Sequence, residues 1–73
     1  MNVYIVSTAT GYRPYVVGRI LEVDPTARFE RTGTCTFWVA TKLTKWSIEC
    51  IDGVAQVYFS IRNLEKFIRE VPN

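Results

Sequence analysis

The sequence predicts an α+β domain: a small antiparallel β-sheet of about four strands, with a C-terminal α-helix packed on one face. Asp52-Gly53 lies between two apolar runs, and Asp-Gly is a strong hairpin signal because a type I′ turn needs positive φ at both central positions. β-branched and aromatic residues dominate two earlier segments, 2–8 and 34–41, as is typical of strands. Apolar residues recur at helical spacing after residue 60, which predicts the helix.

The length of 73 residues predicts a single domain spanning residues 1–73. A chain this short buries only about 60% of the surface that its unfolded form exposes, so it has little room for an enclosed active-site cavity. Its apolar fraction of 48% and aromatic fraction of 14% are those of a folded domain. We expect some of the aromatic side chains on the surface, where Tyr and Trp are typical of interfaces.

Residues 2–8 predict the first strand, and residues 9–14 a turn marked by Gly11 and Pro14. Residues 15–23 are ambiguous. The Tyr-Val-Val run favours a strand, whereas Ile20, Leu21 and Val23 would also suit a helical turn. Because Gly18 argues against a stable helix and for a bulge, we expect a strand here, with a helix as the alternative.

Residues 24–33 contain Pro25 and several charged residues, so they predict a long exposed loop anchored by Phe29. A loop of this length in a small domain is mobile or functional. Residues 34–41 predict the third strand. Cys35, Phe37 and Val39 would point to one face, and Thr36, Trp38 and Ala40 to the other.

Residues 46–51 and 54–59 predict a hairpin around the Asp52-Gly53 turn. In this register Ile48 faces Val57 and Trp46 faces Phe59, so the apolar pairs share one face. Ser60 is the expected N-cap of the C-terminal helix, whose apolar stripe would be Ile61, Leu64, Phe67, Ile68 and Val71. Since so short a helix is marginal alone, it should pack on the apolar face of the hairpin, which makes Trp46 a core residue.

The only cysteines are Cys35 and Cys50, and there is no histidine. Two cysteines without other ligands cannot close a zinc site. Both lie in predicted strands, so we expect small, reduced core residues. A disulfide and a reactive thiol are the alternatives.

The net charge of +2 is too weak to indicate nucleic-acid binding by itself. Residues 1–8 lack the basic and long apolar regions of a signal peptide, and no stretch is apolar enough to span a membrane. We therefore expect a cytoplasmic protein with no membrane contact.

Catalytic chemistry has little support in the sequence. Histidine is absent, the carboxylates are not paired as an acid–base couple, and no nucleophile elbow, phosphate-binding loop or CxxC motif occurs. We expect no enzyme activity, no cofactor, no metal and no small-molecule substrate.

Protein binding is therefore the expected function. The candidate contact residues are those without a predicted core role, of types common at interface hot spots: Tyr12, Arg13, Tyr15, Arg28, Arg31 and Trp38. Each could equally be a neutral surface residue. The alternative is a single-stranded nucleic-acid-binding module of the OB-fold or cold-shock type, using Trp38, Tyr58, Lys42 and Lys45 on an exposed sheet.

Three segments carry a resemblance: residues 1–7 (MNVYIVS), 46–50 (WSIEC) and 63–67 (NLEKF). Through them the whole chain resembles the small early transcription regulators of lytic Xanthomonas bacteriophages. The resemblance implies a protein in the host cytoplasm that binds the N-terminal region of the β′ subunit of host RNA polymerase. It further implies inhibition of sigma-dependent initiation and promotion of antitermination. It assigns no contact residues.

Overall fold

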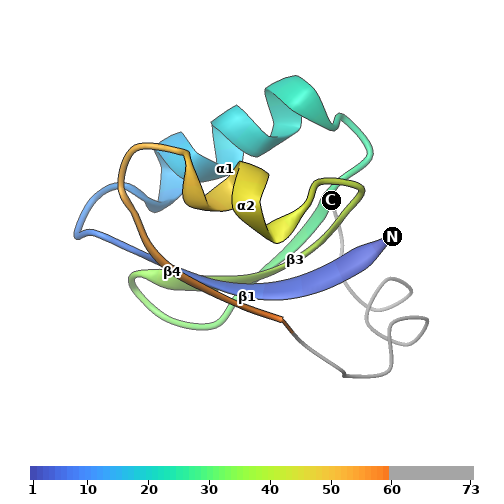
Figure 1. The fold of residues 1–73 in the computed structure, drawn as a ribbon. Helices are drawn as coiled ribbons and strands as arrows, with labels where there is room; N and C mark the ends of the chain where they lie inside the picture. The colour runs from blue at the N-terminus through green and yellow to red at the C-terminus, as the bar shows by residue number, and fades with distance from the viewer. Residues whose placement is uncertain (60–73) are drawn as a thin grey trace.

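A computed structural model describes residues 1–59, which form an α/β sandwich of two layers (Figure 1). The elements are β1 (Asn2–Thr8), α1 (Arg13–Val23), β2 (Arg28–Arg31), β3 (Thr36–Thr41), α2 (Lys45–Glu49) and β4 (Val54–Phe59). The strands form one antiparallel sheet in the order β2-β3-β1-β4. Both helices cover the same face of the sheet (Figure 1). The βαββαβ element order is that of ferredoxin-like folds.

The core lies between the helices and the sheet. Its strand residues lie in register, with Val6 of β1 opposite Phe37 of β3 and Val57 of β4. Alternate residues along a strand share a face, so Tyr4 and Val39 join the same layer. The helices contribute Val16, Ile20 and Ile48, each fully buried.

The predicted antiparallel sheet of about four strands is confirmed, but the predicted place of the helix is wrong. The two described helices lie in the middle of the chain, between β1 and β2 and between β3 and β4. The C-terminal helix expected after residue 60, with its apolar stripe, lies outside the described residues. Neither described helix is long and apolar enough to cross a membrane.

Residues 15–23 belong to α1, so the expected strand is wrong and the helical alternative is correct. Pro14 lies in the first turn of α1, where its fixed φ favours a helix and its missing N–H costs nothing. Val16 and Ile20 stand four residues apart and are fully buried against the sheet. Gly18 is exposed, with open space around its Cα. Its cost of about 0.5–1 kcal/mol is outweighed by the burial of this face.

The prediction that residues 46–51 form the first strand of the hairpin is also wrong, because Lys45–Glu49 form the helix α2. The Thr44 hydroxyl caps this helix by accepting a hydrogen bond from the Ser47 amide at 3.1 Å. In a helix, residues two apart point to nearly opposite sides. Trp46 is therefore 72% exposed while Ile48 is fully buried, which corrects the prediction of Trp46 as a core residue. The chain does turn at Asp52-Gly53, but the turn joins α2 to β4 and is not the predicted type I′: Gly53 has a φ of +90°, whereas no non-glycine residue in 1–59, Asp52 included, has positive φ.

Part of the predicted 24–33 loop is the edge strand β2. Phe29 is its apolar anchor, as expected, and its ring lies 5.7 Å from that of Phe37. Both cysteines were wrongly placed in the core. Cys35 is half-buried in the segment before β3, and Cys50 is exposed just after α2; both are free thiols.

Asp24 ties the C-terminal end of α1 to the end of β3. One carboxylate oxygen accepts hydrogen bonds from the Thr26 amide (3.1 Å) and hydroxyl (2.6 Å). The other accepts from the Thr41 hydroxyl (2.7 Å) and the Lys42 amide (2.9 Å). Burial alone would raise the pKa of Asp24, but these hydrogen bonds outweigh it and hold the pKa far below the usual value of 3.8.

Candidate protein-binding surface

The outer side of the helical layer contains a groove between α1 and α2 with a volume of about 480 Å³. We call it the α1–α2 groove. Its apolar lining comes from Tyr15, Val23, Leu43, Trp46 and Ile51. Arg19, Asp52 and the Cys50 thiol supply polar groups. A groove of this kind accepts apolar side chains of a partner and can hydrogen-bond at its margins.

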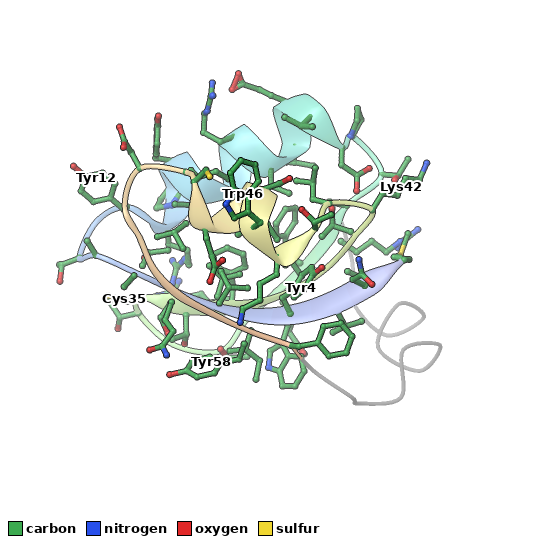
Figure 2. The ribbon with its side chains drawn as sticks, in the orientation of Figure 1. Tyr4, Tyr12, Cys35, Lys42, Trp46 and Tyr58 are labelled. Carbon is green, nitrogen blue, oxygen red and sulfur yellow. The ribbon has the colours of Figure 1, made fainter. Side chains whose placement is uncertain are left out.

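The groove gathers much of the exposed apolar surface of the described chain. Trp46 is 72% exposed, Val23 67% and Tyr15 48%. Figure 2 shows Trp46 on α2, on the far side of the helix from the sheet. Because Ile48 and the Thr44 cap hold α2 in place, the indole is presented on an anchored element rather than on a loose loop.

The charges around the groove are mixed. Arg19 lies 3.3 Å from Glu22 in an exposed ion pair, and Asp52 lines the groove from the turn after α2. The surface therefore has no single-sign field that would select a strongly charged partner. Among residues 1–59 no group of three His, Cys, Asp or Glu residues could hold a metal ion.

Two of the predicted contact residues lie beside the α1–α2 groove. Tyr15 lines it, and the ring of Tyr12 makes an edge-to-face contact with that of Tyr15, their centroids 6.2 Å apart. Tyr12 also packs against Gly53 so closely that a Cβ at Gly53 would meet the ring. The structure thus brings these two tyrosines together with Trp46 on the helical side of the molecule.

The other four predicted contact residues lie elsewhere. Arg13 donates from its guanidinium to the carbonyl oxygens of Gly33 (2.6 Å) and Thr34 (2.8 Å), so it clamps the start of α1 to the β2–β3 connection. Arg28 and Arg31 lie on the edge strand β2. Trp38 is half-buried on β3. These residues do not form one surface with the tyrosines.

Sequence reasoning missed Trp46 and Val23 as surface residues. The available signal for Trp46 was Thr44 three positions before Ser47, a spacing that allows an N-cap and a helix start. The Asp52-Gly53 turn signal favoured a strand on both sides of the turn, so the prediction did not consider Thr44 as the N-cap of a helix.

The sheet face away from the helices, here called the open face, carries a second group of apolar side chains. Ile5 of β1 lies opposite Trp38 on β3 and Tyr58 on β4. Alternation along β1 points Ile5 away from the core residues Tyr4 and Val6. Tyr58 is 48% exposed, and Figure 2 shows it on the side of the sheet opposite Trp46.

Comparisons of this chain with protein-family models, with curated proteins and with solved structures found no match.

Proposed function

We propose that the protein is a non-enzymatic phage regulator that binds host bacterial RNA polymerase at the N-terminal region of the β′ subunit. In this proposal it inhibits sigma-dependent initiation and promotes antitermination. The resemblance to early regulators of lytic Xanthomonas bacteriophages, through residues 1–7, 46–50 and 63–67, supplies the partner. The α1–α2 groove supplies the surface.

The observation that carries the proposal is the exposure of Trp46, 72% of its surface, at the rim of an apolar groove. Trp is the residue type most enriched at energetic hot spots, which sit in water-excluding pockets surrounded by weaker contacts. Tyr15 and Val23 line the same groove. An apolar groove of this kind suits the apolar face of a partner helix.

Regulation by such a contact requires no catalytic activity of the regulator. If the protein binds core polymerase more tightly than the sigma-bound form, its binding shifts polymerase away from sigma by mass action. The coupling is reciprocal, so sigma weakens the binding of the regulator by the same factor. A contact that persists on the elongating enzyme is available to affect termination as well.

Trp46→Ala is expected to weaken binding to Xanthomonas RNA polymerase by more than about tenfold, because it removes the most exposed apolar side chain that lines the groove. Titration of labelled protein with purified core polymerase measures the dissociation constant. Inhibition of sigma-dependent transcription in vitro should fall in parallel.

Trp38→Ala is the matched control, since it removes the other tryptophan of the chain from the opposite face of the sheet. It should leave polymerase binding within about threefold of the unsubstituted protein, because Trp38 does not line the α1–α2 groove. Absence of any polymerase binding by the unsubstituted protein contradicts the proposed function. Equal losses from both variants contradict the α1–α2 groove as the contact surface.

A second candidate function, single-stranded nucleic-acid binding, is favoured by the open face. Trp38 and Tyr58 flank Ile5 on neighbouring strands, so their Cα atoms are about two strand spacings, roughly 10 Å, apart. Aromatic side chains on a four-stranded sheet can stack unpaired bases. The charges on this face are mixed, with Arg28 and Glu30 both on β2, which makes this the weaker proposal.

Titration with single-stranded RNA and DNA oligonucleotides distinguishes this second candidate. It predicts a quench of tryptophan fluorescence that weakens as salt rises and that Trp38→Ala abolishes, while Trp46→Ala retains it. A quench that depends on Trp46 instead, or none at low salt, counts against nucleic-acid binding at the open face.

A further inference from the structure

We propose that residues 60–73, the part of the chain beyond the described residues, pack on the open face of the sheet and cover Val3 and Ala40. The proposal concerns the face opposite the α1–α2 groove, so it does not depend on polymerase binding. Val3 of β1 lies opposite Ala40 of β3. Both residues alternate with the core residues Tyr4 and Val39, so they point to the open face.

Val3 and Ala40 are buried on a face that the described helices do not cover. Val3 is 3% exposed and Ala40 0%, yet neither belongs to the core between the helices and the sheet. Both described helices lie on the other face (Figure 1). Side chains on the outer face of such a sheet are ordinarily in contact with water, as Tyr58 is on this same face, at 48% exposed. The burial of Val3 and Ala40 therefore indicates a cover over one end of the open face.

The described sheet does not itself supply this cover for Val3. The neighbour of Val3 on β3 is alanine, whose side chain is a single methyl group. On the other side, β4 ends at Phe59, which lies opposite Tyr4. Within residues 1–59, Val3 therefore has no strand partner on its β4 side. Because a buried residue ordinarily touches many others, a further segment must pack on Val3.

The chain beyond β4 begins beside this end of the open face. Strands β1 and β4 are antiparallel, so the chain leaves the sheet at Phe59 while it runs toward the level of Val3. The residues that follow have apolar side chains at helical spacing: Ile61, Leu64, Phe67, Ile68 and Val71. A segment with one apolar stripe needs an apolar surface against which to bury it. Its attachment next to such a surface gives it a high effective concentration there.

A cover at this end would restrict what else can bind the open face. Trp38 is two residues from Ala40 on β3, and Ile5 is two residues from Val3 on β1. Residues two apart in a strand share a face, so all four side chains are neighbours. Residues 60–73 would then compete with unpaired bases for the face of Trp38. The helical side of the molecule, with the α1–α2 groove, stays open to a partner protein.

Nuclear Overhauser contacts in the unsubstituted full chain test the proposal directly. The methyl groups of Val3 should show cross-peaks to side chains of the apolar stripe, chiefly Leu64 and Phe67. Isotope-filtered spectra of mixed labelled and unlabelled protein separate contacts within one chain from contacts between two copies. Cross-peaks within one chain support the proposal. Lack of any contact between Val3 and residues 60–73 overturns it, and so do contacts found only between copies.

A matched pair of variants gives an independent measurement. In a Trp46→Phe background Trp38 is the only tryptophan, so acrylamide quenching reports on the accessibility of Trp38. Phe67→Asp places a carboxylate within the apolar stripe and should raise the quenching constant by at least about twofold, because burial of an unpaired charge is strongly disfavoured. Lys66→Asp is the control. It introduces the same side chain one position outside the stripe and should leave the quenching constant unchanged.

The fold of both variants is checked by the amide chemical shifts of Val16 and Ile20, which are buried on the other face of the sheet. Equal quenching constants in the two folded variants contradict the proposal. If Phe67→Asp unfolds the whole domain, the Val3 cross-peaks of the unsubstituted protein decide the question alone.

Discussion

Ile48→Ala is expected to lower the free energy of unfolding by about 2–5 kcal/mol, whereas Trp46→Ala, two residues earlier, should change it by less than about 0.5 kcal/mol. Ile48 is fully buried between α2 and the sheet, and Trp46 is 72% exposed. The loss expected for Ile48→Ala is a large part of the total free energy of unfolding of a small domain, which is about 5–15 kcal/mol. Urea denaturation followed by circular dichroism measures both values.

This pair of variants discriminates directly between a helix and a strand at residues 45–49. In a strand the two side chains would share one face, so both truncations would cost several kcal/mol. In α2 they lie on opposite sides, and only Ile48 contributes to the core. Similar losses from the two variants contradict the helix. The small effect expected for Trp46→Ala also means that its loss of polymerase binding reports on contact rather than on folding.

Asp24→Asn is expected to destabilise the protein by about 2–4 kcal/mol at pH 7. The carboxylate of Asp24 accepts four hydrogen bonds, two on each oxygen. In asparagine an NH₂ group replaces one of these oxygens. This group can only donate, and it would face two groups that also donate, so two of the four hydrogen bonds are lost. Hydrogen bonds to a charged group contribute about 1.5–3 kcal/mol each. Thermal and urea unfolding of the variant measure the loss.

The destabilisation by Asp24→Asn should depend on pH with a defined sign. The folded pKa of Asp24 lies below its usual value of 3.8, so the folded state favours the ionised form. This stabilisation is fully present above about pH 5 and is lost as pH falls through 4 toward the folded pKa. The difference between the unsubstituted protein and the variant should therefore shrink from pH 5 to pH 2.

Glu22→Gln is the matched control for Asp24, because it removes one negative charge near the same end of α1. The side chain of Glu22 is 60% exposed and pairs only with Arg19 among the described residues. An exposed ion pair of this kind contributes about 0–1 kcal/mol, so a small loss without the same pH dependence is expected. An equal loss in the two variants assigns the effect to net charge instead of the Asp24 network.

The strands β1, β3 and β4 could be predicted from the sequence because each has a local pattern that only one structure satisfies. β-branched and aromatic residues fill β1, and in β3 the buried Phe37 and Val39 alternate with Thr36, Trp38 and Ala40. The α1 and α2 segments were predicted wrongly because their local patterns suit both a strand and a helix. Val16-Val17 and Ile48 have high strand propensity, and the choice between strand and helix depends on what they pack against.

The candidate surface depended on this choice even more strongly. Tyr12 and Tyr15 were predicted as contact residues from their types and lie beside the α1–α2 groove. Arg13 was selected on the same grounds, but its guanidinium serves two carbonyl groups of the β2–β3 connection. Trp46 was assigned to the core. A residue type indicates what a side chain can bind, while its direction depends on the element that carries it.

The sequence by itself determined three of the four described strands, the alternation that marks the buried faces of β1 and β3, and the position of the turn at Asp52-Gly53. Each of these depends on interactions among residues close in the chain. Only the tertiary structure decided that α1 and α2 are helices, that β2 forms an edge, and that Trp46 is exposed beside Tyr15. These features arise because the buried faces of Val16, Ile20 and Ile48 meet strands distant in sequence, and the free energy of that burial outweighs local propensity.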